Sequence, residues 1–300
     1  MMDKIILNDV IKSFGSKTVL NIPEFSISRG DTIAFLGTNG SGKTTLIKII
    51  CGLLYQTSGS VDVFGNDNRS SYVRQNTKFV FESGKGYYPY LTAYENIRYF
   101  LGLNKLKFNK IREELLDLVE YFNFSEHLYK KVSQLSQGNR QKMSLIINIL
   151  QEPQVLALDE PTNGLDFIMC EYLAEKICKI ARDKNMTILI TTHDLRFVKQ
   201  VKAKSYIMNK GRLLNKELNN QLWSIFEQKN YKLEVTYDVF NKIDPFLLQE
   251  CKIDKKESVF IIATEKIKNR IIKDYDVISF NPLTMTLDDI YEKAVRDFDL

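Results

Sequence analysis

One glycine-rich segment constrains the fold of this chain more than any other feature. Residues 37–44 read GTNGSGKT, which matches the pattern of glycine, four residues, glycine, lysine and then serine or threonine. An apolar stretch, 32–36, precedes the segment, and a helical pattern, 44–54, follows it. In such a strand, loop and helix, backbone N–H groups converge on phosphate oxygens at the positive end of the helix. We therefore expect this loop to bind the phosphates of a nucleotide.

The residues of the loop have separate expected roles. Lys43 supplies a compact positive charge to the phosphates, and the hydroxyl of Thr44 is an expected ligand of Mg²⁺. The alternative is an ordinary glycine-rich turn, which the complete motif in its strand and helix context disfavours. The predicted nucleotide-binding residues of this loop are Gly37, Thr38, Asn39, Gly40, Ser41, Gly42, Lys43, Thr44 and Thr45.

Two adjacent carboxylates follow a second apolar stretch. Residues 155–158 read VLAL, a pattern typical of a strand buried inside a parallel sheet, and Asp159 and Glu160 come directly after it. Taken alone, the pair could be a solvated strand end. With a phosphate-binding loop upstream, we expect Asp159 to act on Mg²⁺ without direct contact, behind the ligands of the ion or through water, and Glu160 to polarise the water that attacks the γ-phosphate.

Strand and helix patterns alternate along residues 1–215, so we expect an α/β domain with a mainly parallel sheet, antiparallel N-terminal strands and a helical subdomain at about 83–150. The composition changes after residue 211, and we place a domain boundary near 216. For residues 216–300 we expect a small α/β domain. Its predicted strands are 231–240, 258–264 and 275–280, and its predicted helices are 218–228, 265–273 and 287–296.

Composition excludes several classes of protein. The chain has 300 residues, of which 44% are hydrophobic and 26% charged, as in ordinary soluble globular proteins. Its longest apolar stretch, 49–55, is far shorter than the roughly 20 residues that span a bilayer. The start of the sequence lacks the features of a secretory signal, so we expect a cytosolic location. The four cysteines form no pair typical of zinc sites. The net charge is +5, but the lysines are dispersed, and we expect no nucleic-acid partner.

A pentapeptide before the second apolar stretch adds another anion-binding helix terminus. Residues 135–139 read LSQGN. The segment resembles the signature of the ATP-binding-cassette (ABC) family, whose usual form is LSGGQ. Gln137 and Asn139 stand here in place of glycine and glutamine.

Other elements of that family occur in the expected order. Residues 163–166, NGLD, resemble the D-loop, and residues 191–194, TTHD, resemble the loop of the switch histidine. The resemblance covers about residues 4–215. It implies that His193 contacts the γ-phosphate and orients the attacking water, whereas His127 is left as a structural residue.

The resemblance also implies how ATP is held. ATP and Mg²⁺ lie between the phosphate loop of one subunit and the signature of another, so we expect a dimer of this chain or of this chain with a homologous ATPase. The residues expected to contact nucleotide from the signature and the D-loop are Ser136, Gln137, Gly138, Asn139 and Asp166.

Two further positions match family elements with a change of residue. Phe14 occupies the position of an aromatic residue, usually tyrosine, that stacks on adenine, an interaction worth about 1–3 kcal/mol by analogy with nucleic-acid binders. The alternative is that Phe14 is a core residue. Glu82 occupies the position of the Q-loop glutamine, which touches Mg²⁺ and transmits the nucleotide state to a membrane partner. A carboxylate there accepts hydrogen bonds only.

Two weaker likenesses bear on the partner. Residues 87–96, YYPYLTAYEN, resemble the segment that receives a coupling helix of a transporter, although these aromatic residues could equally be ordinary packing. Residues 283–291 resemble the C-terminal end of ATPases that serve ABC-2 type exporters. We therefore expect a peripheral ATPase at the cytoplasmic face of the membrane that powers a separate membrane-spanning permease. The alternatives are a soluble ABC ATPase without a transport role and a regulatory module that binds ATP without hydrolysing it. The presence of both Glu160 and His193 disfavours the regulatory module.

Overall fold

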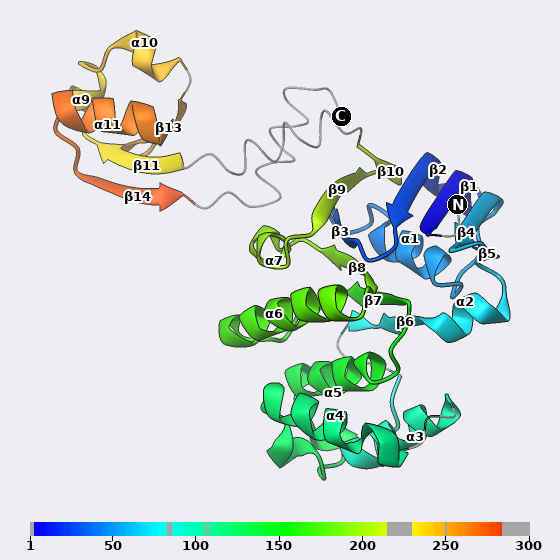
Figure 1. Cartoon of the computed structure of the whole chain (residues 1–300). Coiled ribbons are helices and arrows are strands. Elements are labelled where there is room, and N and C mark those ends of the chain that lie inside the picture. The colour runs from blue at the N-terminus through cyan, green and yellow to red at the C-terminus, as the bar shows by residue number, and fades with distance from the viewer. Residues whose placement is uncertain are drawn as a thin grey trace. The chain divides into compact units, whose positions relative to one another are not determined.

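The structure of the chain is a computed structural model that describes residues 3–82, 86–104, 106, 108–214, 230–249 and 251–283. The chain divides into two compact units, residues 1–214 and residues 215–300 (Figure 1). Among the described residues, no helix combines the length and the apolar character needed to cross a membrane.

An antiparallel sheet forms the N-terminal part of the first unit. Its strands lie in the order β2-β1-β4-β5. Alternate residues of β1, among them Ile5 and Leu7, are fully buried, as expected for a sheet with one face on a core. The bounds are β1 Lys4–Phe14, β2 Lys17–Ser28, β4 Ser58–Val63 and β5 Asn66–Asp67.

A second sheet carries the nucleotide motifs. Its order is β10-β9-β3-β8-β7-β6, with parallel pairing throughout except between β9 and β10. Every residue of β7 and β8 is buried, which explains the apolar runs 155–158 and 188–190 within them. The carboxyl ends of β3, β7 and β8 lie at one edge of the sheet. The bounds are β3 Thr32–Leu36, β6 Thr77–Val80, β7 Val155–Asp159, β8 Thr187–Thr192, β9 Lys204–Asn209 and β10 Arg212–Leu213.

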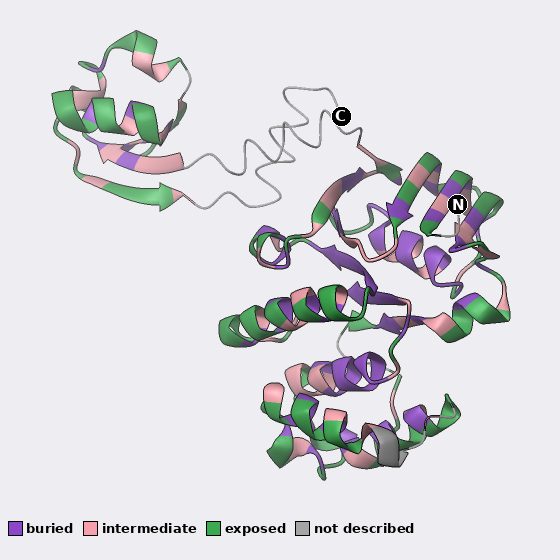
Figure 2. Cartoon of the chain, in the orientation of Figure 1, coloured by how far each residue is buried: buried purple, intermediate pink, exposed green. Residues whose placement is uncertain are grey.

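Helices cover these sheets and form a subdomain of their own. α5 is buried over most of its length, because α3 and α4 pack against it (Figure 2). A capping box formed by Thr92 and Glu95 is present at the start of α3. The bounds are α1 Lys43–Ile50, α2 Ser71–Asn76, α3 Ala93–Leu103, α4 Phe108–Tyr121, α5 Gln137–Ile149, α6 Phe167–Asp183 and α7 Leu195–Gln200, with short 3₁₀ turns η2 Ser125–His127 and η3 Val132–Gln134.

One continuous core joins the two sheets of the first unit through α1. Apolar residues of β1, β2, β3 and β4 pack against Leu46, Ile47 and Ile50 of that helix. The helix that carries Lys43 is therefore held on several sides by packed side chains, which fixes the phosphate loop at its start. This arrangement confirms the predicted α/β fold with antiparallel N-terminal strands.

The second unit is an antiparallel sheet with helices packed on it. Its order is β12-β13-β11-β14, and its core includes Leu233, Ile261 and Ile271. The bounds are β11 Asn230–Val235, α9 Tyr237–Phe240, α10 Pro245–Leu248, β12 Lys252–Lys255, β13 Val259–Thr264, α11 Glu265–Asp274 and β14 Ser279–Leu283. The predicted helices 218–228 and 287–296, and most of the exporter-like stretch 283–291, lie outside the described residues.

Two strand predictions in this unit were wrong. The predicted strand 231–240 ends at Val235, because the hydroxyl of Thr236 accepts a hydrogen bond from the backbone N–H of Val239 and starts a short helix. The predicted strand 275–280 is shifted, because α11 runs to Asp274 and pairing begins only at Ser279.

Candidate active site

The phosphate loop has the backbone that its glycines allow. Gly40 and Gly42 have φ of 83° and 106°, values that favour glycine, and Gly42 is the N-cap of α1. A Cβ on Gly37 would lie 2.5 Å from Ser41 Oγ and 2.7 Å from the carbonyl oxygen of Met208. The loop is thus closely packed on its inner side, and its N–H groups lead into the start of the helix.

The side chain of Lys43 lies over the loop and is almost fully buried. Its Nζ donates to the carbonyl oxygens of Gly37 and Thr38 at 2.7 Å and 3.1 Å. Burial lowers the pKa of Lys43, and the carboxylates of Glu160 and Asp159 oppose that shift. The ammonium group is therefore already positioned inside the loop, where phosphate oxygens can replace the two carbonyls as its partners.

The carboxylate of Asp159, at the end of β7, accepts hydrogen bonds from two hydroxyl groups. Thr44 Oγ1 donates to Asp159 Oδ1 at 2.7 Å, and Thr191 Oγ1 of β8 donates to the same oxygen at 2.6 Å. Asp159 and Thr191 are direct neighbours in the parallel register of β7 and β8. The hydroxyl groups of Thr44 and Thr191 thus fix the Asp159 carboxylate beside the first turn of α1.

Glu160 follows Asp159 in a conformation that is uncommon for a residue with a side chain. Its φ is 47°, and its N–H donates to the carbonyl oxygen of Thr191 at 3.0 Å. A non-glycine residue in this region costs about 1–3 kcal/mol and is found preferentially at functional sites. The strained backbone turns the Glu160 side chain toward Lys43 and His193.

The Glu160 carboxylate lies between the imidazole of His193 and the ammonium group of Lys43. His193 Nδ1 is 3.0 Å from Glu160 Oε2, and Lys43 Nζ is 4.0 Å from Glu160 Oε1. The Glu160 side chain is 12% exposed, and its burial raises the pKa of the carboxyl, with His193 and Lys43 opposing the shift. A partly desolvated carboxylate of raised pKa next to a 61% exposed histidine has the properties of a general base.

The residues present fit a phosphate group and a divalent cation. Ser41 Oγ is buried at the loop and has no hydrogen-bond partner among the described residues. An unpaired buried hydroxyl is costly, and a phosphate oxygen would satisfy it. The Thr44 hydroxyl and the Asp159 carboxylate supply the hard oxygen ligands that Mg²⁺ prefers.

The signature segment lies at the start of α5, in a different part of the first unit from α1 (Figure 1). Ser136 is the N-cap of α5, and its Oγ accepts from the N–H of Asn139 at 3.2 Å. Gly138 has no room for a side chain, since a Cβ there would overlap the carbonyl oxygen of Gly164. The signature and the D-loop are therefore in direct contact within one chain, and Asp166 caps α6 beside them.

Phe14 and Glu82 contact residues other than Lys43, Asp159 and Glu160. Phe14 is 53% exposed at the end of β1, with Lys12 Nζ 4.8 Å from its ring centre, so it is not a core residue. Glu82 Oε1 accepts a hydrogen bond from Asn163 Nδ2 of the D-loop at 3.0 Å.

Three residues at this site were not assigned a role from the sequence. Thr191 and Asn163 contact Asp159 and Glu82 as described above, and His127 contacts Asn139 of the signature, with 3.2 Å between Nε2 and Asn139 Nδ2. Thr191 had one available signal, because it ends an apolar strand next to the switch histidine. Asn163 belongs to the segment 163–166 that resembles the D-loop, but no local pattern indicates its contact with Glu82 or the contact of His127 with Asn139.

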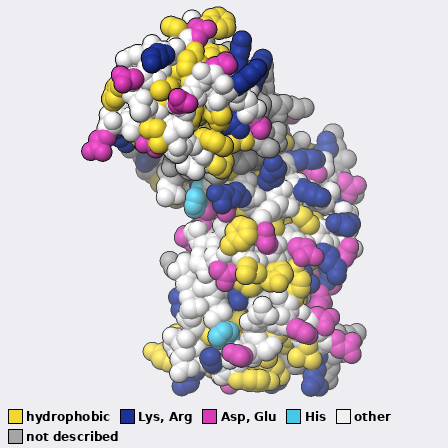
Figure 3. Space-filling model, turned by 90° about the vertical axis from the view of Figure 1, so that its left-hand side faces the viewer, with side chains coloured by type: hydrophobic (Ala, Val, Ile, Leu, Met, Phe, Trp, Pro, Cys, Tyr) yellow, Lys and Arg dark blue, Asp and Glu magenta, His cyan; other side chains and the backbone are white. Residues whose placement is uncertain are grey.

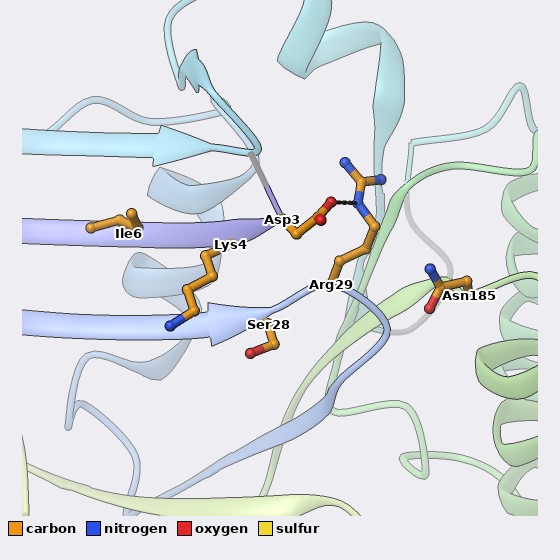
Figure 4. A pocket seen from close by; sticks show the side chains of 6 residues that line it. All are labelled: Asp3, Lys4, Ile6, Ser28, Arg29 and Asn185. Carbon is orange, nitrogen blue, oxygen red and sulfur yellow. Dashed lines mark ion pairs between the residues drawn. The ribbon is translucent and has the colours of Figure 1, made fainter. Parts of the chain in front are cut away.

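A separate hollow lies at the opposite edge of the parallel sheet (Figure 4). It has a volume of about 580 Å³, and some of its lining residues come just before β3 and β8 in the sequence. Arg29 is held there by Asp3 at 3.3 Å, by Gln154 at 3.3 Å and by the ring of Phe64 at 3.9 Å. Its guanidinium is thus engaged within the chain, and the hollow is distinct from the nucleotide motifs. The lining residues are Asp3, Lys4, Ile6, Ser28, Arg29 and Asn185.

Sequence comparisons place the chain among known proteins. A model of the ABC transporter family matches residues 20–163. The chain is 31% identical over 292 residues to an uncharacterized ABC transporter ATP-binding protein, YdbJ, of Bacillus subtilis, covering 94% of this chain and 92% of that protein. It is 32% identical over 212 residues to the bacitracin transport ATP-binding protein BcrA of Bacillus licheniformis, covering 69% of this chain and 67% of that protein.

Relatives named for import also match. The iron(III) import ATP-binding protein FbpC of Pasteurella multocida is 31% identical over 225 residues, covering 74% of this chain and 63% of that protein. These likenesses therefore do not separate an exporter from an importer.

Solved structures show the same fold. The ATP-binding subunit of an ABC transporter has a TM-score of 0.66 and 25% identity to this chain, covering 73% of this chain and 93% of that one.

Proposed function

This chain belongs to the ABC transporter family of ATP-binding proteins, and on that premise we propose that its ATPase unit drives a separate membrane-spanning permease in an exporter. The observation that carries the ATPase part is the connected cluster of Lys43, Thr44, Asp159, Glu160 and His193 at the end of the phosphate loop. The likeness of residues 283–291 to ABC-2 type ATPases supports export over import.

ATP binding uses the phosphate loop, from Gly37 to Thr45. Lys43 exchanges the carbonyl oxygens of Gly37 and Thr38 for β- and γ-phosphate oxygens, and Ser41 Oγ gains the partner that it lacks. Phe14, exposed at the end of β1, is available for stacking on the adenine. Thr44 and Asp159, with Glu82 of the Q-loop, are the residues that would hold Mg²⁺. When bound, Mg²⁺ neutralises negative charge on the phosphates.

Hydrolysis places a water molecule between Glu160 and the γ-phosphate. The Glu160 carboxylate accepts a proton as the water oxygen forms its bond to phosphorus and the bond from phosphorus to the bridging oxygen of ADP breaks. His193, hydrogen-bonded to Glu160 at 3.0 Å, orients that carboxylate and the water. Lys43 stabilises the charge that moves onto the leaving oxygen.

A second subunit completes each site. Within one chain the signature contacts the D-loop and lies apart from α1 (Figure 1). A second copy, or a homologous ATPase, can therefore present Ser136–Asn139 and Asp166 to the nucleotide on the first. ATP binding closes this dimer, and hydrolysis opens it.

The permease contact involves the aromatic segment at residues 87–96, to which Tyr99 of α3 is added by its contact with Tyr88. The Tyr87 side chain packs inside the subdomain, where its hydroxyl lies 2.8 Å from Ser144 Oγ. Tyr90 is 83% exposed, and Tyr88 and Tyr99 are exposed and stacked edge to face with 5.0 Å between their ring centres. An exposed aromatic cluster on a small subdomain suits docking of an amphipathic segment from a permease.

The first test is capture of the partner. Tagged Glu160→Gln protein is expressed in its own host, gently solubilised from salt-washed membranes and analysed for stoichiometric partners. We expect a polytopic membrane protein. Recovery only from the soluble fraction, with a cytosolic partner or none, would favour a non-transport ABC ATPase instead.

A matched pair of variants tests the contact surface. Tyr90→Ser should lower permease capture at least tenfold, whereas Phe246→Ser, a change at a 72% exposed aromatic residue of the second unit, should leave it unchanged. Equal capture by both variants would contradict the assigned surface. The direction of transport is tested with the ATPase and its captured permease, purified together and reconstituted in vesicles. Stimulation of ATP hydrolysis by cargo on the side of the ATPase indicates export, and stimulation by cargo on the opposite side indicates import.

A further inference from the structure

His127 lies against the signature segment, although no chemistry of the family resemblance involves it. It ends the turn η2, and its ring is 5.8 Å from the ring of Phe124. One edge of the imidazole faces Asn139, with His127 Nε2 at 3.2 Å from Asn139 Nδ2. The other edge faces Lys130, with Nδ1 at 3.5 Å from Lys130 Nζ. The ring therefore lies between a lysine and a signature residue.

These neighbours restrict the tautomer of the ring. A neutral imidazole has one donor nitrogen and one acceptor nitrogen, and a lysine ammonium can only donate. Lys130 is thus best served when Nδ1 is the acceptor, which places the ring proton on Nε2. An asparagine amide can turn by 180° without a change of shape, so it can offer its oxygen to that proton.

We propose that His127 is a positioning residue of the signature: its Nε2–H holds the amide oxygen of Asn139, so that the Asn139 NH₂ group faces outward as a donor to an anionic group. The anion is the terminal phosphate of ATP bound to the opposite subunit, and this part rests on the proposed function. In the opposite orientation of the amide, the Asn139 oxygen would face the phosphate oxygens, and these acceptors would repel each other.

The charges around His127 favour the neutral ring. Burial lowers its pKa, as do the ammonium groups of Lys130, in the turn that follows η2, and Lys142, on α5. Glu126, its neighbour in η2, opposes that shift. The ring is consequently neutral at the pH of the cytosol, as a fixed tautomer requires.

The tautomer can be measured directly on the nucleotide-free protein. The chain has only two histidines, and they lie well apart at the surface (Figure 3). Long-range ¹H–¹⁵N spectra of ¹⁵N-histidine protein, assigned with the His127→Gln variant, report which ring nitrogen carries the proton. We expect the proton of His127 on Nε2 at pH 7.5. A proton on Nδ1, or a doubly protonated ring, would overturn the proposal.

The functional consequence is tested in the Glu160→Gln background, by sedimentation with saturating ATP. His127→Leu removes the donor and should weaken ATP-dependent dimerisation about tenfold. His127→Gln places an amide NH₂ near the position of Nε2 and should keep it within threefold. ATP affinity below the dimerising concentration should be unchanged in both variants, because the signature acts on the nucleotide of the other subunit.

The outcomes separate positioning from simple packing. Equal weakening by both variants, at equal resistance to urea, would mean that His127 only fills space, and no weakening by His127→Leu would remove its role. If the parent variant itself fails to dimerise with ATP, the proposed function is at fault, and the tautomer measurement still decides the orientation of Asn139.

Discussion

Replacing Glu160 with glutamine should stabilise the nucleotide-free fold at neutral pH. Burial raises the pKa of the Glu160 carboxyl above its ordinary value of 4.5, even with His193 and Lys43 nearby. Below pH 4.5 the group is protonated in both the folded and the unfolded chain. Above its folded pKa it is ionised in both, and ionisation then destabilises the folded chain by an amount that grows with the rise in pKa, since a tenfold change in proton affinity corresponds to about 1.4 kcal/mol.

Glutamine cannot ionise, so the variant escapes this cost. The gain in free energy of unfolding over the wild type should be small near pH 4.5, grow as the pH rises through the folded pKa, and then level off. The assay is urea unfolding of both proteins, without nucleotide, at pH values from 5 to 8. The control is Glu171→Gln, at an exposed position of α6, for which a difference under about 0.5 kcal/mol is expected at every pH.

A gain that does not change with pH, or a variant that is less stable than the wild type at pH 8, would refute this reasoning. The same substitution should lower ATP turnover by about 10² to 10⁴, the usual contribution of a general base. Turnover above about a tenth of the wild-type value would exclude Glu160 from that role. Stability gained together with activity lost is the pattern expected of a residue retained for function.

Three other substitutions test separate parts of the structure. Thr191→Val removes the buried hydroxyl that donates to Asp159 and should cost about 1.5–3 kcal/mol in urea unfolding, so a loss under 0.5 kcal/mol would contradict the bond. Gly138→Ala forces the carbonyl of Gly164 to move and should reduce ATP-dependent dimerisation and turnover at least tenfold in an otherwise stable protein. Unchanged turnover would mean that the D-loop can shift without loss of activity. Ile261→Ala leaves a cavity in the second unit and should destabilise it by about 2–5 kcal/mol, seen as faster hydrogen exchange over residues 230–283 while the first unit stays protected.

The features that could be predicted from the sequence are local ones. The strand, loop and helix around Lys43 follow from the chemistry of adjacent residues, because glycine freedom, helix start and apolar strand are all visible within one short segment. The same holds for the buried strands β7 and β8, whose apolar character reflects burial on both faces.

Local patterns also mislead where they continue past the end of an element. Apolar and polar residues alternate from 231 to 239, yet the strand stops at Val235. The competing signal is one side chain, Thr236, whose hydroxyl caps a helix of four residues. So short a helix has too few residues to show its own periodicity.

Some contacts between distant segments could not be predicted, among them contacts at three positions where the chain departs from the usual family residues. Glu82, in place of glutamine, accepts from Asn163, 81 positions away. Asn139, in place of glutamine, lies beside His127, and the Gln137 side chain, in place of glycine, lies over Gly164. Each changed residue thus has a contact inside the same chain that suits its size and hydrogen-bonding groups. A single sequence shows the departure but not the partner, because nothing near either residue encodes the pair. Double-mutant cycles on these pairs would therefore measure whether the departures act as coupled changes rather than as independent losses.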